Sequence, residues 1–468
     1  MTRYIIIFFL LFAFHLAKAS DTVTIFGVDT CYAGTEIIFN KYSDQISGSE
    51  TILGKDVVGN DGRFSIGFEI NEITFVFSYL GIYKMHLYAC PGMKYEIVLP
   101  PRQEKEPADL LNPYFDPVVV HLATVSYDKN ELNSQIRMFT DTYLPYYNKH
   151  ITALAERNDF SELDKDIARM EKSFASSQDA YFNDYRRYRY GLLRHLAYQQ
   201  RSTSISNEYF RNQPVLLNNP AYMELFNQVY DNYLHHIARP SDGQLLGKAI
   251  QSGSIDSMRI FLNSNDLLGT GDLPDLVLLK FLYDEFYDDN YSRSTLLRIL
   301  DAYIAENISQ PMTEVAVSIR KEVTRLLIGF APPSFSLYNR DSVLVSIENF
   351  KGKYVYLNFC SCFSYTCLSE FKMLEALYAK HKDILEIVSI IVDNDYNIID
   401  SFLERSKYEW TFLHYGNQSS IIREYDIRAF PTYYLIDRQG KLAMSPAPSP
   451  GDEFEARLFQ LMRSRGEL

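Results

Sequence analysis

The C-terminal third of the chain is organised around one stretch, which runs from Lys353 to Cys367 and reads KYVYLNFCSCFSYTC. Its first seven residues form a short, mostly apolar run of the kind that predicts a buried β-strand. Three of the five cysteines follow within eight residues, at Cys360, Cys362 and Cys367. A helical pattern begins there, and a helix N-terminus stabilises a thiolate because its free N–H groups carry partial positive charge. The strand-to-helix junction is therefore a candidate redox site.

The sequence beyond this junction alternates between strand and helix patterns. We expect an apolar strand at 387–392, a helix at 398–406, a strand at 433–437 and a final helix that carries Phe454 and Leu458. Alternation of this kind predicts a central β-sheet covered by helices, which is an α/β fold.

Several short motifs occur in order in this part of the chain. They are APPSFSL at 331–337, FKGK at 350–353, LNF at 357–359, FPT at 430–432 and LID at 435–437. In their order they are similar to motifs of the TlpA/ResA-type thioredoxin-fold thiol–disulfide oxidoreductases, envelope proteins of the AhpC/TSA–thioredoxin-like superfamily. The resemblance implies a thioredoxin fold for residues 331–468. It also implies that Phe430, Pro431 and Thr432 form the substrate-binding loop, with Pro431 as the family's cis-proline.

The active-site pair departs from the family pattern. The family has Cys-x-x-Cys at the start of the helix, and the corresponding positions here are Ser364 and Cys367. A serine hydroxyl does not ionise near neutral pH and forms no mixed disulfide, so the attacking thiol of the family is replaced. Glu370 corresponds to the family's active-site carboxylate, which implies that it moves a proton for Cys367. The alternative is a glutamate of the first helical turn, stabilised by the helix dipole.

Three interpretations of this degenerate site remain. Cys362 could replace the lost nucleophile and pair with Cys367, provided that their Cα atoms approach to within about 7 Å. Ser364 and Cys367 also resemble the Thr/Ser-x-x-Cys of peroxiredoxins, but Cys360 stands where a proline is expected and Pro431 is typical of thioredoxins. In the third interpretation the fold has lost its reaction and only binds. We expect thiol–disulfide exchange through the first pairing, and the alternative is a non-catalytic binding or scaffold protein.

No metal or cofactor site is expected from the motifs. Zinc suits thiolates, but the three clustered cysteines lack a fourth ligand with C-x-x-C or histidine spacing. The sequence has no His-x-x-x-His pair, and its acidic cluster at 284–289 lacks the spacing of a calcium loop. It also lacks a phosphate-binding glycine loop. The resemblance instead implies protein partners, either envelope proteins or a redox partner.

The rest of the chain predicts two further parts. Residues 21–100 contain short β-rich runs and are expected to form a small antiparallel β-sandwich. Cys31 and Cys90 lie in this part, and either form a disulfide or remain two buried thiols. Residues 118–328 follow a proline-containing linker and have helical patterns without a clear repeat. A β module, an all-α middle region and an α/β thioredoxin fold make a multidomain protein, a layout that resembles exported family members of Gram-negative bacteria.

Length and charge agree with this division. A chain of 468 residues is long enough for about three domains. Its net charge of −13, from 46 basic and 59 acidic residues, provides no electrostatic footprint for nucleic acid. Tyrosine and phenylalanine are abundant, at 36 and 31 residues, whereas Trp410 is the sole tryptophan. This composition is typical of extensive half-buried surfaces more than of one specific chemistry.

The N-terminus predicts export. Arg3 precedes an apolar run at 4–16 and an A-x-A cleavage signal at 17–19, as in a signal peptide of residues 1–19. The run is shorter than the roughly 20 residues that span a bilayer, and an N-terminal membrane anchor is the alternative. We expect a mature protein of the periplasm or cell envelope that does not span the membrane. Disulfides persist in such a compartment, and five cysteines leave at least one thiol unpaired within the chain.

Overall fold

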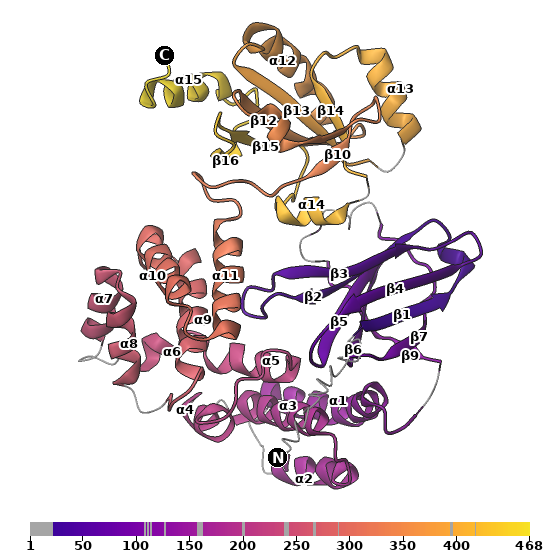
Figure 1. Cartoon of the computed structure of the whole chain (residues 1–468), viewed down its shortest axis with the longest axis vertical. Coiled ribbons are helices and arrows are strands. Elements are labelled where there is room, and N and C mark those ends of the chain that lie inside the picture. Colours follow the sequence, from indigo (N-terminus) through magenta and orange to yellow (C-terminus); the bar gives the residue numbers. More distant parts are fainter. Residues whose placement is uncertain are drawn as a thin grey trace, which may run out of the picture. The chain divides into compact units, whose positions relative to one another are not determined.

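The computed structural model describes residues 22–106, 109, 112, 115–125, 128–156, 162–198, 202–237, 243–264, 268–288, 290–393, 396–416 and 418–468 (Figure 1). The predicted signal peptide lies outside the described residues. Internal contacts divide the chain into two compact units. The first consists of Met1–Glu104, Pro117–Arg239 and Leu262–Val277, and the second of Lys105–Asp116, Pro240–Phe261 and Leu278–Leu468.

The β-rich part of the first unit forms two sheets. Its strands are β1 (Thr22–Val28), β2 (Glu36–Tyr42), β3 (Glu50–Val57), β4 (Arg63–Glu69), β5 (Thr74–Leu80), β6 (Tyr83–Ala89), β7 (Lys94–Val98), β8 (Val118–His121) and β9 (Ala123–Thr124). One sheet has the order β4-β1-β7-β9 and the other β3-β2-β5-β6-β8. Burial alternates along β4 because successive side chains of a strand point to opposite faces. Buried residues of both sheets, such as Ile25, Phe39 and Ile66, share one hydrophobic core.

The helical region begins later than residue 118, where the sequence patterns placed its start. Val118–His121 runs parallel to β6, with Val118 opposite Tyr83, and β9 pairs with β7. Three consecutive valines favour a strand because β-branched side chains fit a pleated sheet. The first helix, α1, begins only at Leu132, so residues 118–124 belong to the two sheets. The predicted antiparallel arrangement is also incomplete, since β6–β8 and β1–β7 are parallel pairs.

The first helices belong to the same unit as the two sheets. They are α1 (Leu132–Glu156), α2 (Leu163–Phe174), α3 (Ala180–Tyr198), α4 (Ser202–Ile205), a π-helical segment (Ser206–Phe210), α5 (Pro220–Val229) and α6 (Tyr233–Ile237). The ring of Tyr88 on β6 lies 6.0 Å from that of Tyr181 and 5.8 Å from that of Tyr185, between centroids. The backbone N–H of Tyr88 also donates to Asn133 Oδ1 at 2.7 Å. Aromatic packing therefore joins α3 to β6, and a hydrogen bond joins α1 to β6.

The second unit contains the later helices and the C-terminal domain. The helices are α7 (Gly243–Ser252), α8 (Ile255–Asn263), α9 (Leu273–Tyr287), α10 (Arg293–Glu306) and α11 (Gln310–Thr324). The last two residues of α8 and the first five of α9 belong to the other unit. Beyond α11, Gly329 donates to the carbonyl of Leu442 and Leu442 donates to that of Phe330, both at 2.8 Å. Arg325 donates to the carbonyl of Arg423 at 2.9 Å. These bonds attach the end of the helical region to the C-terminal domain.

The C-terminal domain has the predicted thioredoxin-like α/β fold. Its elements are β10 (Ser336–Tyr338), β11 (Leu344–Ser346), β12 (Tyr354–Cys360), α12 (Tyr365–His381), β13 (Leu385–Ile391), α13 (Tyr396–Ser406), β14 (Thr411–His414), α14 (Ser419–Glu424), β15 (Thr432–Ile436), β16 (Leu442–Ala447) and α15 (Phe454–Ser464). The central sheet has the order β14-β13-β12-β15-β16. β12 is parallel to β13 and antiparallel to β15. All seven residues of β12 are buried, as expected for a central strand.

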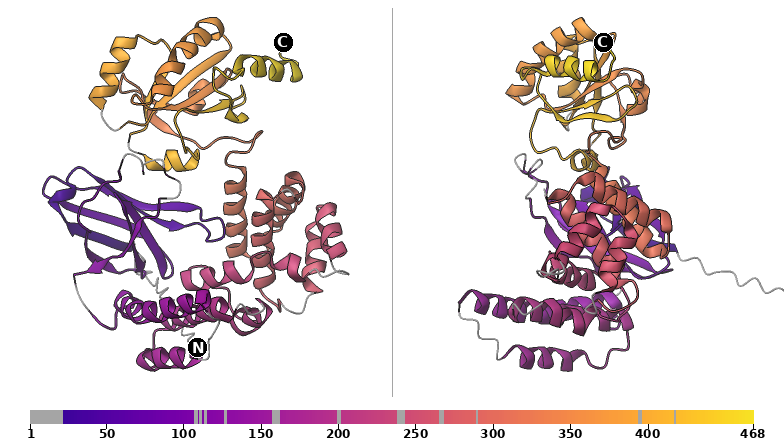
Figure 2. Two further views of the ribbon diagram at one scale, coloured as in Figure 1. Left: turned by 180° about the vertical axis from the view of Figure 1, so that it is seen from behind. Right: turned by 90° about the vertical axis from the view of Figure 1, so that its left-hand side faces the viewer.

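Helices cover both faces of this sheet (Figure 2). On one face α12, α13 and α15 form a core that includes Cys367, Phe371 and Trp410. On the other face α14 packs over a second core. The indole Nε1 of Trp410 donates to Ser389 Oγ at 3.0 Å, and its ring lies 6.2 Å from that of Phe371. The one tryptophan is therefore buried in the same core as Cys367 and Phe371 of α12.

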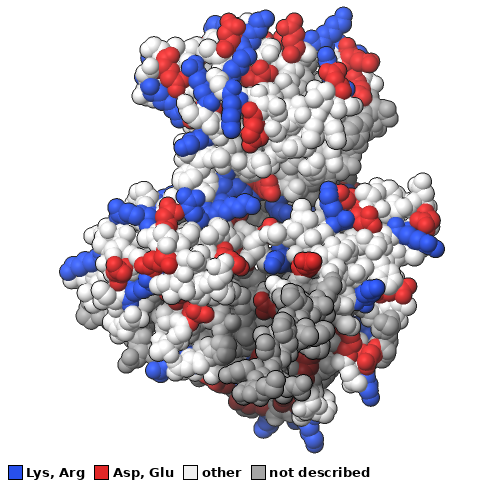
Figure 3. Space-filling view, in the orientation of Figure 1, with Lys and Arg blue, Asp and Glu red and all other residues white. Residues whose placement is uncertain are grey.

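The surface of the C-terminal domain carries charges of both signs. On the face seen in Figure 3, its basic and acidic side chains are interspersed. Fields of opposite sign therefore alternate over short distances on this face.

Among the helices that the structure describes, none combines the length and the apolar character needed to cross a bilayer.

Candidate functional site

The end of β12 and the start of α12 bring the three clustered cysteines together. Cys360 is the last residue of β12, is fully buried, and its Sγ donates to the carbonyl of Ile390 at 3.7 Å. Cys367 lies in the first turn of α12 and is 1% exposed. Cys362 lies between them and is partly buried against the same core. All three are free thiols in the structure.

Ser364 is the N-cap of α12. Its backbone is extended, and its side-chain oxygen accepts a hydrogen bond from the N–H of Cys367 at 3.4 Å. This bond satisfies one of the N–H groups that a helix start leaves unpaired. Serine is a favourable residue for this position, so the helix keeps its start although the family's attacking thiol is absent. Phe363 and Tyr365 on either side of the cap are 69% and 86% exposed.

Asp393 belongs to the site, although none of the sequence motifs includes it. Ser361 Oγ donates to its Oδ1 at 2.7 Å, and the N–H of Cys362 donates to its Oδ2 at 2.5 Å. The parallel register places Cys360 opposite Ile391, which brings the residues after both strands to one edge of the sheet. The signal available in the sequence was an acidic residue two positions after β13, the strand that pairs with the strand of Cys360.

The protein environment disfavours ionisation of the site's thiols. Burial and then the negative charge of Asp393 raise the pKa of Cys362 to about 12. Burial also raises the pKa of Cys367, although hydrogen bonds from Ser364 and the backbone of Ser361 oppose this. Cys360 is completely buried, and its pKa is well above that of an ordinary thiol. At neutral pH these groups are therefore present almost entirely as thiols.

Glu370 faces the sheet from α12. The hydroxyl of Tyr433 on β15 donates to Glu370 Oε2 at 2.5 Å. Burial raises the pKa of the Glu370 carboxyl, and the bond from Tyr433 opposes that shift. Glu370 lies beyond the first turn of α12, which contains no acidic residue, so the alternative of a first-turn glutamate is wrong. The negative charge of Glu370 also acts on the nearby Cys367 thiol.

The expected substrate-binding loop lies beside the end of β12. The peptide bond between Phe430 and Pro431 is cis. Thr432 begins β15 opposite Phe359, and its Oγ1 donates to the carbonyl of Ala429 at 2.7 Å. Phe359 directly precedes the cysteines, so the register brings the loop to the edge of the sheet where the thiols lie.

Cys31 and Cys90 are not brought together by the fold. Cys90 precedes β7, and β7 runs parallel to β1 with Lys94 opposite Thr24, at the start of β1. Cys31 follows the other end of β1. Seven residues of strand span about 20 Å, whereas a disulfide requires Cα atoms within about 7 Å. Both residues are free thiols, Cys31 exposed and Cys90 partly buried.

The described residues contain no group of three or more histidine, cysteine or acidic side chains with an arrangement that could hold a metal ion. The three cysteines and Asp393 therefore form a cluster of thiols, hydrogen-bond donors and one carboxylate. Groups of these kinds can transfer protons and, at sulfur, exchange disulfide bonds.

Comparison with known proteins identifies the C-terminal domain. Residues 329–453 match the Redoxin family. The thiol-disulfide oxidoreductase ResA of Bacillus thuringiensis subsp. konkukian is 28% identical over 120 residues, which cover 25% of this chain and 68% of that protein. The thioredoxin-like protein YneN of Bacillus subtilis is 26% identical over 148 residues, or 31% of this chain and 82% of that protein.

A solved structure also aligns with part of the chain. The thioredoxin domain of a thiol-disulfide oxidoreductase from Bacteroides vulgatus is 23% identical, with a TM-score of 0.27, and the alignment covers 29% of this chain and 97% of that one. The Redoxin match thus falls on the domain that carries the thiol cluster. The C-terminal part of this chain, residues 329–453, is a Redoxin domain similar in sequence to thiol-disulfide oxidoreductases.

Proposed function

We propose that the chain is an exported thiol–disulfide oxidoreductase, which acts on disulfides of envelope proteins through Cys362 and Cys367. The observation that carries the proposal is the position of these two thiols in one cluster at the start of α12, each within the electrostatic field of the other. Cys362 is the more accessible of the two, which suits the attacking role. The similarity of the Redoxin domain to thiol-disulfide oxidoreductases supports the same reaction.

Reduction of a substrate disulfide would take two exchange steps. In the first, the Cys362 thiol gives its proton to Asp393, and the thiolate attacks one substrate sulfur. A mixed disulfide forms, and the other substrate sulfur leaves as a thiolate that takes up a proton. In the second step, Cys367 loses its proton to Glu370 and attacks Cys362 Sγ, which releases the second substrate thiol. Two electrons reach the substrate, and a dithiol partner then reduces the Cys362–Cys367 disulfide.

The surroundings of the thiols suit a polypeptide substrate. Phe363 and Tyr365 expose aromatic rings on both sides of the helix cap. The loop of Phe430, Pro431 and Thr432 is the proposed backbone contact of the substrate. Exposed aromatic residues supply contact area at low cost in conformational entropy, so we expect them to hold a peptide segment against Cys362.

Reduction of insulin with dithiothreitol as electron donor tests the proposal on the full chain. We expect Cys362→Ser and Cys367→Ala each to reduce the enzyme-dependent rate to the level of dithiothreitol alone. Cys31→Ser is the matched control, because it removes an exposed thiol outside the site and should leave the rate unchanged. Turnover by the native chain that persists undiminished in Cys367→Ala would contradict the proposed pair.

Binding without reaction is the second candidate function. It is favoured by the serine at the attacking position and by the raised pKa values of Cys362 and Cys367. A binding protein would retain a scrambled or reduced polypeptide equally well in the native chain and in Cys362→Ser, and would not accelerate insulin reduction. The same insulin assay therefore distinguishes the two functions.

A further inference from the structure

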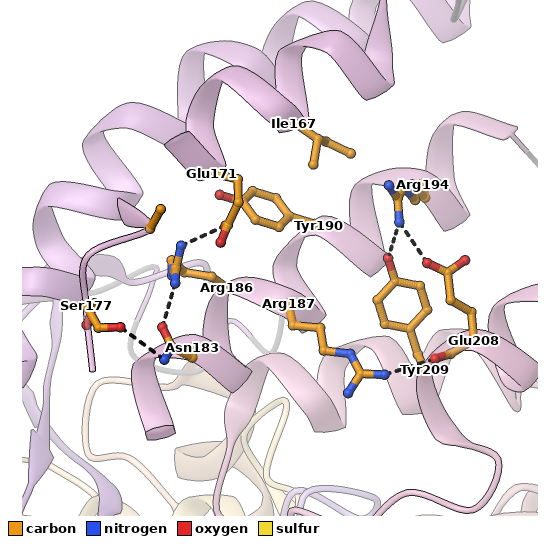
Figure 4. A pocket seen from close by; sticks show the side chains of 11 residues that line it. Ile167, Glu171, Ser177, Asn183, Arg186, Arg187, Tyr190, Arg194, Glu208 and Tyr209 are labelled. Atoms are coloured by element: carbon orange, nitrogen blue, oxygen red, sulfur yellow. Dashed lines mark hydrogen bonds and ion pairs between the residues drawn. The ribbon is translucent and has the colours of Figure 1, made fainter. Parts of the chain in front are cut away.

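A cavity of about 440 Å³ lies in the first unit, apart from the thiol cluster (Figure 4). It is bordered by α2, α3 and the π-helical segment Ser206–Phe210. Cavities of roughly 300–1,000 Å³ bind small molecules or the ends of larger ones. The proposed exchange reaction uses none of the residues that line this cavity.

Positive charge predominates in the wall of the cavity. Arg186, Arg187 and Arg194 line it from α3, against two carboxylates, Glu171 and Glu208. Arg186 Nη1 donates to Glu171 Oε2 at 2.7 Å, and Arg194 Nη1 donates to Glu208 Oε1 at 2.8 Å. Arg194 also pairs with Asp164 of α2 at 3.1 Å. Among the described residues, Arg187 is the arginine of the wall for which no ion pair is seen.

Arg187 is held by a neutral group of the wall. Its Nη2 donates to the backbone carbonyl of Glu208 at 2.9 Å. Asp184 lies in electrostatic range of Arg187 but is not part of the cavity wall. A guanidinium presents five N–H donors in a planar fork, so Arg187 retains donors that can bind a planar anion.

Two buried donors of the wall have no hydrogen-bond partner among the described residues. They are Nε of Arg186 and the hydroxyl of Tyr190, which nevertheless lies within electrostatic range of Glu171 and Arg186. The Arg186 side chain is 5% exposed and Tyr190 is 6% exposed. Arg186 and Tyr190 are four residues apart on α3, so they lie on one helical face. Leaving a buried donor unpaired is unfavourable, and a ligand oxygen in the cavity would satisfy both.

The wall also has an apolar side, formed by Ile167 of α2 and by Ala175. We propose that this cavity binds a monocarboxylate with a short apolar body, such as a small organic acid or the C-terminal residue of a peptide. The carboxylate would lie between Arg187, Arg186 and Tyr190, and the apolar body against Ile167. The carboxylate would pair with the Arg187 guanidinium, and its planar shape matches the guanidinium fork.

Calorimetric titration of the full chain with N-acetyl-leucine tests the proposal. The matched probe is N-acetyl-leucinamide, which has the same apolar body and a neutral amide in place of the carboxylate. Inorganic phosphate is a third probe, because it is an oxyanion without an apolar body. We expect saturable binding of N-acetyl-leucine, and binding of the amide and of phosphate that is at least about tenfold weaker.

Two variants locate the binding in the cavity. Arg187→Gln removes the guanidinium that would pair with the carboxylate, and Tyr190→Phe removes one hydroxyl with almost no change in volume. Each should weaken binding of N-acetyl-leucine, by about tenfold for Arg187→Gln and by several-fold for Tyr190→Phe. Arg63→Gln on exposed β4 changes the net charge equally and should bind as the native chain does. Far-ultraviolet circular dichroism of each variant reports folding, and Tyr190→Phe remains informative if Arg187→Gln does not fold.

The outcomes decide the proposal in either direction. Binding that requires the carboxylate and is weakened by Arg187→Gln or Tyr190→Phe, with Arg63→Gln unaffected, supports the site. Absence of saturable binding to the native chain overturns it, as does equal binding of acid and amide. Phosphate that binds as tightly as N-acetyl-leucine, or folded variants that bind like the native chain, would also overturn it.

Discussion

At the scale of single residues, Ser364 separates this chain from a Cys-x-x-Cys oxidoreductase. Ser364 caps α12 and accepts from the N–H of Cys367. Because this position is a helix N-terminus, a thiol placed there would have a lowered pKa, unlike the partly buried Cys362, whose pKa is raised. The fold thus retains the helix N-terminus that would activate an attacking thiol, but the residue at this position carries a hydroxyl.

Ser364→Cys should increase activity. We expect insulin reduction to accelerate by about tenfold or more at pH 7, since a thiolate at the helix N-terminus forms more readily. The loss of the serine cap should decrease the free energy of unfolding by about 1 kcal/mol. Ser369→Cys, on the exposed surface of the same helix, is the control. Equal rates for both variants would mean that residue 364 does not reach the substrate.

Replacement of Asp393 should make the Cys362 thiol more reactive, not less. The charge of Asp393 contributes to the raised pKa of Cys362, so Asp393→Asn should lower that pKa and increase the thiolate fraction at pH 8. Alkylation of Cys362 by iodoacetamide, followed by mass spectrometry, should become several-fold faster. Asp383→Asn, an exposed change of the same charge in this domain, should have no effect.

The pH dependence follows from the same shift. With a pKa of about 12, alkylation of Cys362 in the native chain should rise about tenfold per pH unit between pH 7 and 10, without a plateau. A plateau below pH 9 would contradict the high pKa of this thiol.

The residues of the site differ in how far sequence could predict them. Glu370 and Pro431 were predicted because they lie in short sequence motifs. In the structure Glu370 lies near Cys367, and the peptide bond before Pro431 is cis. Asp393 was missed because its contact with Cys362 depends on the register of β12 and β13, which are 31 residues apart at this point.

At the scale of elements, strands β6 and β8 place two histidines side by side. His86 and His121 are opposite each other in register, with ring centroids 5.0 Å apart. Burial lowers the pKa of His86 to about 3 and that of His121 to about 4. Both rings are therefore neutral in the folded chain well below pH 6.

This histidine pair predicts a loss of stability in acid. The unfolded chain has histidine pKa values near 6.5, so between pH 6.5 and about 4 it binds more protons than the folded chain. Stability is complete above pH 6.5 and is lost as the pH falls, by roughly 2 kcal/mol per histidine between pH 7 and 5. Urea unfolding at both pH values measures the loss. His86→Phe should remove about half of it, and an unchanged difference in this variant would refute the assignment.

Sequence patterns predicted elements better than their pairing. The run before Cys360 is the central strand β12, and the helix after Ser364 is α12. The valines at 118–120 were included in the helical region because their strand partner, β6, is distant in sequence. The same limitation applies to Cys31 and Cys90, which only the parallel register of β1 and β7 separates.

At the scale of the whole molecule, the chain forms two compact units, and the thiol cluster and the arginine-lined cavity belong to different ones. Sequence patterns give no signal for this division, since α9 is one continuous helix whose residues belong to both units. Tyrosine-rich packing, such as that of α3 on β6, holds the first unit together.

Export of the whole chain is predicted from residues 1–19. Expression in a Gram-negative host should give a periplasmic product that begins at Ser20, because cleavage follows the A-x-A signal. Intact-mass spectrometry measures the processed end. Ala19→Arg should leave the precursor uncleaved, whereas Ala33→Arg, beyond the signal, should be processed normally. A periplasmic product that retains residues 1–19 would instead indicate the membrane anchor.

The burial of Trp410 has a practical consequence for such experiments. The only tryptophan of the chain lies in the core that contains Cys367, next to Phe371 on α12. Its fluorescence therefore originates entirely in the Redoxin domain, although the other unit contains many aromatic rings. Tryptophan fluorescence therefore reports, without any label, on the core that contains Cys367. A ligand that binds only in the cavity of the first unit should leave this fluorescence unchanged.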